Sequence, residues 1–291
     1  IQDCRDNLKD RYLEEADYLI SLYTSPHEVV LEELNGFLDE AQTVILNILF
    51  INQYYENIHT LYNETEEKTS EYSLSYIYGL TCHNQGKYKE AGQILNRLAE
   101  QKENFRTAAF AVTSTVYGIV TEFYTGNKPS DTLEHCLERI RYLKNKYPDA
   151  PQDDILRLTF TEFKILMDVN PGEFMECYEI LDADIQGSID FLMLKGNYYE
   201  IQREFDQAQD VYLNLPWKEN ELILGHLLTC YLKEHKYQEI LDHYAQALPE
   251  IQKKISVRRF CLPAMEYTQP EKYEQVLTEL LEQAGDNLED L

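Results

Sequence analysis

Large apolar residues recur along most of the chain at a spacing of three and then four positions, with a smaller residue in the middle of each triplet. In the copy within residues 72–101 the triplet is Tyr88, Ala91 and Leu95. Residues three and four apart lie on the same face of an α-helix, so each triplet predicts a helix that buries one side.

The helix of residues 88–100 is predicted to pair with a helix of residues 73–85. Gly86 begins the turn between them, and glycine suits a tight turn because it adopts backbone angles that other residues avoid. Gly79 and Ala91 lack bulk. The two helices are therefore expected to come close together at these two residues.

The triplet occurs seven times, and its first residue stands at positions 54, 88, 133, 174, 205, 237 and 273. The clearest copies lie in 72–101, 189–216 and 221–248. This pattern predicts antiparallel helix pairs over residues 41–284, preceded by a helical cap over 1–40 and followed by a polar tail over 285–291.

The cap is expected to contain two helices. The first should bury an apolar stripe made of Leu13, Ala16, Leu19, Ile20 and Tyr23. Ser25 followed by Pro26 is typical of a helix start, with serine as the cap and proline in the first turn. Ser130 is expected to cap a later helix.

The spacing resembles the tetratricopeptide repeat (TPR), in which small residues mark the helix crossing and an aromatic residue follows the turn. The residues that carry the resemblance are Gly79, Tyr88, Ala91, Gly196, Phe205, Ala208 and Tyr237. The resemblance implies an all-α fold, an α-solenoid (superhelix) of about seven TPR-like helix pairs with an N-terminal helical cap. It also implies a concave groove that binds a partner chain.

The chain is strongly acidic, with 52 Asp and Glu residues against 26 Lys and Arg residues and a formal net charge of −26. This charge disfavours binding to nucleic acid and to anionic membranes, and it favours a partner with a basic surface. No apolar run is long enough to predict insertion into a membrane.

The sequence offers no motif for catalysis, for a cofactor or for a metal. It lacks a phosphate-binding loop, a nucleophile elbow, a dinucleotide fingerprint and a tight His/Cys ligand set. The protein is therefore expected not to be an enzyme. Its six cysteines are spread widely and most lie on apolar stripes, which predicts reduced thiols and a cytoplasmic or nuclear location.

We expect a protein-protein interaction scaffold or adaptor that holds a basic or amphipathic segment of a partner in the groove. The resemblance implies that groove residues come mostly from the first helix of each pair, and the candidates are Tyr76, Leu80, His83, Asn197, Glu200 and Thr229. Tyr76 can serve either the core or the binding surface.

Two basic clusters interrupt the acidic sequence, one of Arg139, Arg141, Lys144 and Lys146, the other of Lys253, Lys254, Arg258 and Arg259. Intramolecular pairing with neighbouring acids is the simpler interpretation. The alternative is docking of an acidic segment, and for this reason Arg258 and Arg259 join the candidate binding residues.

Two other functions stay open. The chain can be a stoichiometric structural subunit of a multi-subunit complex such as a vesicle coat, as its size and helical repeats suggest. It can also be a ligand-sensing or enzymatic helical protein, which would require a closed polar pocket rather than an open groove.

Overall fold

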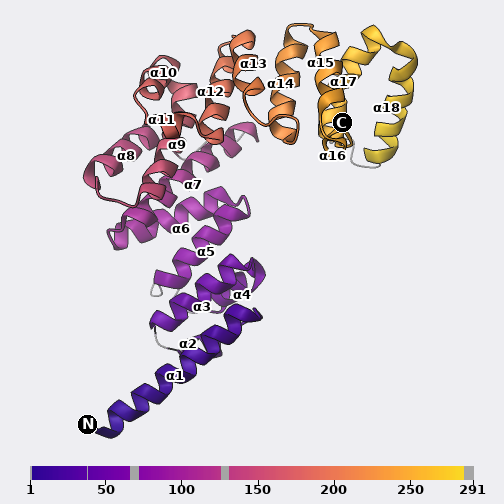
Figure 1. Cartoon of the computed structure of the whole chain (residues 1–291). Coiled ribbons are helices and arrows are strands. Elements are labelled where there is room, and N and C mark those ends of the chain that lie inside the picture. Colours follow the sequence, from indigo (N-terminus) through magenta and orange to yellow (C-terminus); the bar gives the residue numbers. More distant parts are fainter. Residues whose placement is uncertain (1, 38, 66–71, 126–130, 285–291) are drawn as a thin grey trace. The chain divides into compact units, whose positions relative to one another are not determined.

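The computed structural model describes residues 2–37, 39–65, 72–125 and 131–284, and in these residues it contains 18 helices and no strand (Figure 1). The predicted all-α fold is confirmed. The chain divides into two compact units, residues 1–165 and 166–291, and the boundary falls within helix α9 (Gln152–Val169). The expected polar tail over 285–291 lies outside the described residues.

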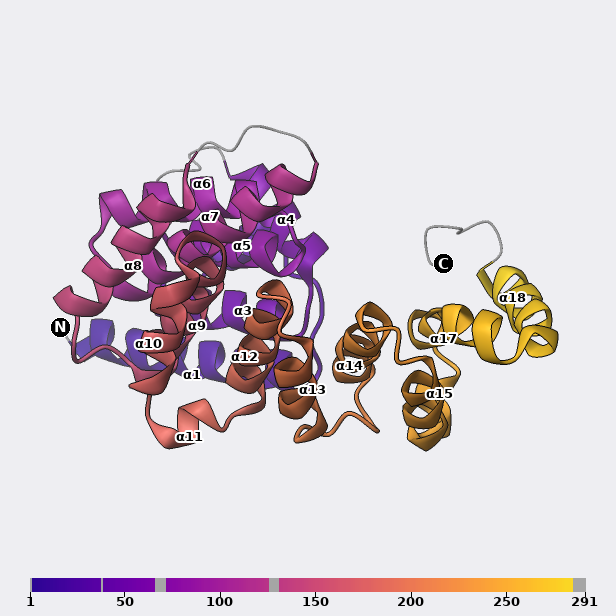
Figure 2. The ribbon, with the colours of Figure 1, turned by 90° about the horizontal axis from the view of Figure 1, so that it is seen from above.

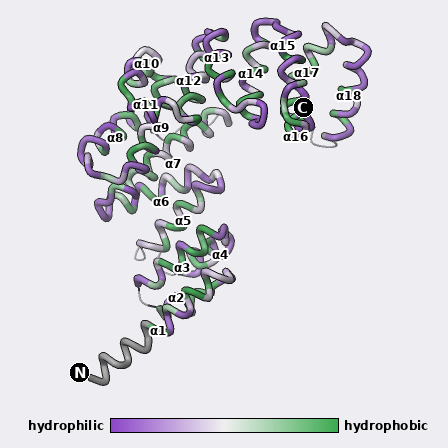
Figure 3. The backbone as a smooth tube through the Cα atoms, viewed as in Figure 1, coloured by the Kyte–Doolittle hydropathy of each residue, from purple (hydrophilic) through white to green (hydrophobic). Residues whose placement is uncertain are grey.

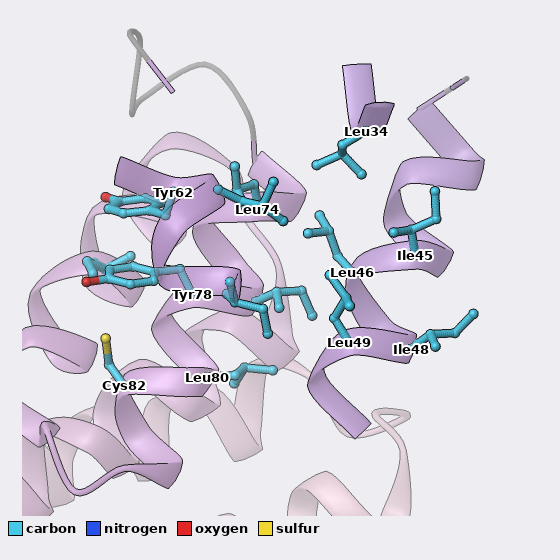
Figure 4. Close-up of a cluster of buried hydrophobic side chains, with 14 of the residues drawn as sticks. Leu34, Ile45, Leu46, Ile48, Leu49, Tyr62, Leu74, Tyr78, Leu80 and Cys82 are labelled. Atoms are coloured by element: carbon cyan, nitrogen blue, oxygen red, sulfur yellow. The ribbon is translucent and has the colours of Figure 1, made fainter. Parts of the chain in front are cut away.

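Unit 1 consists of helices of unequal length. They are α1 (Gln2–Thr24), α2 (Leu31–Asn35), α3 (Asp39–Ile51), α4 (Tyr55–Glu64), α5 (Tyr72–Asn84), α6 (Tyr88–Gln101), α7 (Phe105–Tyr124), α8 (Leu133–Lys146) and the first part of α9. Each helix from α3 to α7 packs against the next one. Figure 4 shows the core that α2 to α5 share, with Leu34, Leu46, Leu49 and Leu74 pointing toward one another.

Unit 2 comprises nine helices in the described residues that follow α9. They are α10 (Pro171–Glu179), α11 (Ala183–Gln186), α12 (Ile189–Ile201), α13 (Phe205–Leu213), α14 (Glu221–Lys233), α15 (Tyr237–Gln246), α16 (Pro249–Gln252), α17 (Ile255–Thr268) and α18 (Pro270–Ala284). Figure 2 shows α14, α15 and α17 side by side, and they share a core centred on Leu224, Leu228 and Cys261. Figure 3 shows α18 as largely hydrophilic.

Four tight turns join helices in the same way. Gln53, Gly86, Arg203 and His235 each adopt a positive φ, between 58° and 75°. In every case the N–H of this residue bonds the carbonyl three residues back, and the next N–H bonds the carbonyl five residues back. This is the Schellman arrangement, which satisfies the last carbonyls of the first helix.

The shared turn fixes the register of the repeat. The second helix begins two residues after the positive-φ residue, at Tyr88, Phe205 and Tyr237. By the same count the first pair begins at Tyr55, so the sequence prediction that placed this position at Tyr54 is wrong by one residue. Ile58 and Tyr62, three and seven residues after Tyr55, are buried, but so are Asn57 and Leu61 of the predicted triplet, so the position of the turn sets the register.

Glycines let two of these pairs approach closely. A Cβ atom added to Gly79 would lie 2.8 Å from Leu95 Cδ2, and one added to Gly196 would lie 2.4 Å from Tyr212 Cε1. The predicted approach at Gly79 is therefore confirmed. The side chain that fills the space over the glycine is the one sixteen residues later in both pairs.

The short helices α11 and α16, which the sequence analysis did not predict, belong to a repeated helix end. Gln186 donates from Nε2 to the carbonyls of Tyr178, Glu179 and Leu181, and the Tyr178 hydroxyl donates to the Gln186 carbonyl. Tyr244 and Gln252 make the same exchange after α15. A glutamine eight residues after a tyrosine thus satisfies terminal carbonyls of each helix.

The predicted buried stripe of α1 is wrong. Leu13, Ile20 and Tyr23 are 57%, 62% and 71% exposed, and Ala16 is also exposed, whereas the buried face carries Glu15 and Leu22. Leu19 is half-buried beside that face. Spacing alone could not choose between two apolar stripes on one helix.

Two predicted caps are also wrong. Ser25-Pro26 begins no helix, because the chain stays irregular until α2 starts at Leu31. Ser130 lies outside the described residues, and the residue that caps α8 is Thr132, whose side chain accepts a hydrogen bond from the His135 N–H.

Substitution of two helical glycines by alanine should have opposite effects. Gly196→Ala should lower the free energy of unfolding by about 1–3 kcal/mol, because its Cβ would overlap the Tyr212 ring. Gly225→Ala should raise it by up to about 1 kcal/mol, since its Cβ would only touch Phe260 at 3.6 Å and alanine favours helix. Urea unfolding of the two variants measures both, and equal stability of Gly196→Ala and wild type would contradict the packing argument.

The positive-φ turns give a second stability test. Gly86→Ala should cost about 1 kcal/mol through backbone strain alone, because nothing lies within 4 Å of the added Cβ. Arg203→Gly, at the equivalent exposed position, should stabilise the protein by up to about 1 kcal/mol. The measurement is the urea midpoint of each variant, and a change of the same sign in both would refute the shared turn.

Candidate functional site

A cleft of about 450 Å³ lies between α14 and α17 in unit 2. Its lining residues are Asn220, Glu221, Leu222, Gly225, His226, Thr229, Ser256, Arg259 and Phe260. It is the best candidate for a functional site because it contains the predicted residues Thr229 and Arg259, and because the predicted residue Glu200 bonds one of its walls.

The apolar part of the cleft is made by three residues. Gly225 has no side chain and lies opposite the Phe260 ring. Leu222, one turn earlier on α14, leaves 63% of its surface exposed. An exposed leucine beside an aromatic ring and a bare stretch of helix gives a hollow that fits an apolar side chain.

A hydrogen-bond network that begins in α12 and α13 forms the polar wall. The Tyr212 hydroxyl donates to Glu200 Oε1 at 2.5 Å and lies 2.8 Å from Asn197 Oδ1. The same Glu200 oxygen lies 2.8 Å from His226 Nδ1. Burial and the neighbouring Glu200 carboxylate raise the pKa of Tyr212 above its usual range, so Tyr212 stays protonated and holds Glu200 in place.

The structure thus brings Asn197 and Glu200 together, but gives them a supporting position. Asn197 bonds Tyr212 inside the unit, and Glu200 reaches the cleft through His226. Sequence reasoning did not select His226, Leu222 or Phe260. A glycine in the middle of a predicted helix, Gly225, was the available signal that a hollow lies there.

The opposite wall belongs to α17. Ser256 donates a short hydrogen bond to Glu221, and Lys254 lies 3.9 Å from the other Glu221 oxygen. The Arg259 guanidinium lies over the Phe260 ring, 5.3 Å from its centre, and the residue is exposed. Pro263 has no N–H, so the Arg259 carbonyl lacks its helical donor.

Arg258 faces away from the cleft lining. Its side chain is 16% exposed and donates to Glu279 at 2.7 Å and to Gln283 at 3.3 Å, both on α18. The contact ties α17 to α18, which favours a structural role for Arg258. Arg259 is thus the member of the pair that lines the cleft.

The candidates of unit 1 come from α5 and differ in exposure. Leu80 is only 8% exposed and packs in the core rather than on the surface. Tyr76 is half-buried, and burial raises its pKa to about 12. His83 lies 2.9 Å from Ser114 Oγ and contacts the rings of Phe110 and Tyr117, while burial lowers its pKa.

The basic cluster on α8 pairs within the protein. Arg139 donates to Asn96, and Arg141 and Lys144 both bind Glu162 at 3.0 and 2.8 Å. Lys146 pairs with Glu103. Pairing with neighbouring acids, the simpler of the two interpretations, fits Arg141, Lys144 and Lys146, whereas the partner of Arg139 is an amide.

The described part of the chain offers neither a metal site nor a membrane-spanning helix. It holds no group of three or more His, Cys, Asp or Glu side chains placed to bind a metal ion. Among its helices, none combines the length and the apolar character that a membrane span needs.

Comparison with known proteins identifies no relative. A scan against protein-family models finds none that matches this chain. A search of curated proteins likewise finds no match.

Four cysteines are buried as free thiols, namely Cys82, Cys136, Cys230 and Cys261, and Cys177 is half-buried. The side chain of Cys4 lies outside the described residues. Burial raises the pKa of Cys82 to about 11 and that of the other three buried thiols to about 12. These thiols are therefore held in their neutral form.

The raised thiol pKa values predict a loss of stability in alkali. An unfolded cysteine ionises near pH 8.5, so above about that pH the unfolded state loses protons that the native state keeps. The contribution is fully present below about pH 8.5 and declines as the pH rises towards about 12. Urea midpoints should therefore fall steadily above this pH.

Cys261→Ala tests the assignment, because this variant should show a shallower fall of the midpoint with pH than wild type. The measurement is the difference in slope, not the midpoint itself, since the lost sulfur also leaves a small cavity. Identical slopes in the two proteins would contradict a buried neutral thiol at this position.

Proposed function

We propose that the protein is a non-catalytic scaffold or adaptor that binds a partner polypeptide, with the cleft between α14 and α17 as its main docking site. The observation that carries the proposal is this cleft, in which an exposed leucine and an aromatic ring stand beside polar groups. Interface cores commonly combine an apolar anchor pocket with a polar rim.

We further propose that the chain is an α-solenoid of TPR-like helix pairs. The support is the repeated Schellman turn, the glycine crossings in two pairs and the packing of helices against close neighbours in the chain. Repeats whose units contact their neighbours build such elongated structures. The count of about seven pairs rests on the sequence triplets.

The partner segment that suits the cleft is an amphipathic helix with basic residues beside its apolar stripe. Unit 2 contains 25 acidic and 10 basic residues, a net charge of −15. Glu221 lines the cleft, where its carboxylate would meet lysine or arginine of the partner. One apolar side chain would enter the hollow between Leu222 and Phe260.

The free thiols support a reducing compartment, such as the cytoplasm or the nucleus, as the place of action. Cys82, Cys136, Cys230 and Cys261 are buried and unpaired as disulfides. Proteins in oxidising compartments more often pair such residues.

Binding of a designed peptide tests the docking site. The probe is a fluorescein-labelled amphipathic helix of leucine and lysine, compared with a scrambled peptide of the same composition. Leu222→Ser should weaken binding of the helical peptide about tenfold, because it removes most of a leucine contact and barely affects the fold. The measurement is fluorescence anisotropy.

The matched control is Ile180→Ser, which removes another exposed apolar residue of unit 2, one that does not line the cleft. It should bind like wild type. Equal binding of the helical and scrambled peptides, or an equal effect of the two variants, would overturn the proposed site.

A second candidate function is a subunit of a larger assembly, which the exposed stripe of α1 favours. Leu13, Ala16, Ile20 and Tyr23 lie on one side of that helix and face solvent. Such a stripe on a long helix is typical of a surface that a further subunit covers. Capture of the protein in a fixed ratio with several large partners, lost in Ile20→Ser, would favour this candidate.

A further inference from the structure

Unit 1 carries a surface on which positive charge gathers, although the protein as a whole is acidic. We call it the cationic face and define it by Tyr76, Arg106, Phe110, Tyr117, Arg157 and Lys164. These residues come from α5, α7 and α9, and all of them lie within unit 1.

The helical spacing places these side chains in adjacent stripes. Arg106, Phe110 and Tyr117 follow one side of α7, and Arg157 and Lys164 follow one side of α9. The stripes touch, because the Arg157 guanidinium lies 4.3 Å from the centre of Phe110 and Lys164 Nζ lies 2.9 Å from the Tyr117 hydroxyl.

A single buried carboxylate orients two of the cations. Asp154, only 2% exposed, accepts from Arg106 Nε and from Arg157 Nη1, each at 3.0 Å. One carboxylate cannot neutralise two guanidinium groups, so the cluster keeps a surplus positive charge. Arg106 is more than half exposed, and its charge is accessible from solvent.

Few acidic side chains lie on the three helices of the cationic face, and some of them pair with cations of other helices. Helix α5 contains no Asp or Glu, and α7 contains only Glu122, which pairs with Lys89 of α6 at 2.6 Å. On α9, Glu162 is held by Arg141 and Lys144 of α8. Asp153 is exposed at the start of α9, and Asp168 is exposed one turn after Lys164 on the same helix. The local surplus of positive charge therefore lies at Arg106 and Arg157, the two arginines that share Asp154.

Aromatic rings hold the cations in place. Lys164 Nζ lies 4.8 Å from the centre of Tyr117 and 4.9 Å from that of Phe160. A cation over a ring loses side-chain freedom before any partner arrives, which lowers the entropic cost of binding. The rings also offer apolar surface beside each charge.

We infer that the cationic face docks an acidic segment of a partner polypeptide. Carboxylates of that segment meet Arg106, Arg157 and Lys164, and an apolar side chain between them lies against Phe110 and Tyr117. The inference rests on the proposed polypeptide-binding function, but it concerns the other unit and a partner of opposite charge. The two docking surfaces are thus complementary to different kinds of segment.

The test uses the full chain and a fluorescein-labelled peptide of alternating glutamate and phenylalanine. A peptide with glutamine in place of glutamate controls for charge. Wild type should bind the acidic peptide in low salt, and the affinity should fall about tenfold between about 50 and 300 mM salt, because exposed charges are screened. The double substitution of Arg106→Gln and Lys164→Gln should weaken binding about tenfold, because each substitution removes a charge-assisted contact with the peptide.

A control with the same change in net charge is Lys233→Gln combined with Lys272→Gln, two exposed lysines of unit 2. It should bind the acidic peptide like wild type. Arg106→Lys combined with Lys164→Arg keeps the charges and should retain most of the binding, which separates lost charge from a damaged fold.

Three outcomes would overturn the inference: no binding of the acidic peptide to wild type, equal binding of the glutamine peptide, or an equal effect of the two double substitutions. None of them affects the leucine–lysine peptide test at Leu222, because that test uses another unit. Failure of both peptides to bind would reject the proposed function itself.

Discussion

The close contact between a glycine in one helix and a large side chain in the next is the constraint on which each of two helix pairs depends. Tyr212 lies so near Gly196 that no larger residue fits there without a shift. The ring is fully buried, and its hydroxyl then holds Glu200. Glu200 in turn bonds His226 in the wall of the cleft. A packing requirement between α12 and α13 thereby positions a polar group of the candidate site.

Much of the helix arrangement could be predicted from the spacing of apolar residues. The turn at Gly86 and the two helices around it are confirmed to within one residue, because a glycine between two apolar patterns is recognisable in the sequence as a turn. The equivalent turns have Gln53, Arg203 and His235 in place of the glycine, and these residue types do not indicate a turn. Their backbone strain is sustained by packing of the flanking helices, which a single sequence does not display.

The surface was harder to predict than the core. The stripe of Leu13, Ile20 and Tyr23 on α1 was predicted to be buried, but the buried face of this helix carries Glu15 and Leu22. The prediction failed because one helix can carry apolar residues on two sides. The net charge of the chain favoured a partner with a basic surface, and neither of the two basic clusters in the sequence includes Arg106 or Arg157. The local surplus of positive charge around Asp154 arises only when α7 and α9 place these two arginines on the same carboxylate.

The Schellman turns have a consequence for how far such a chain can drift in evolution. Each turn is held by bonds between backbone atoms, so it asks little of its own side chains beyond tolerance of a positive φ. A glycine, a glutamine, an arginine and a histidine all occupy the position here. A repeat defined by main-chain geometry can keep its shape while its amino-acid residues change, and its copies then become hard to recognise even within one chain.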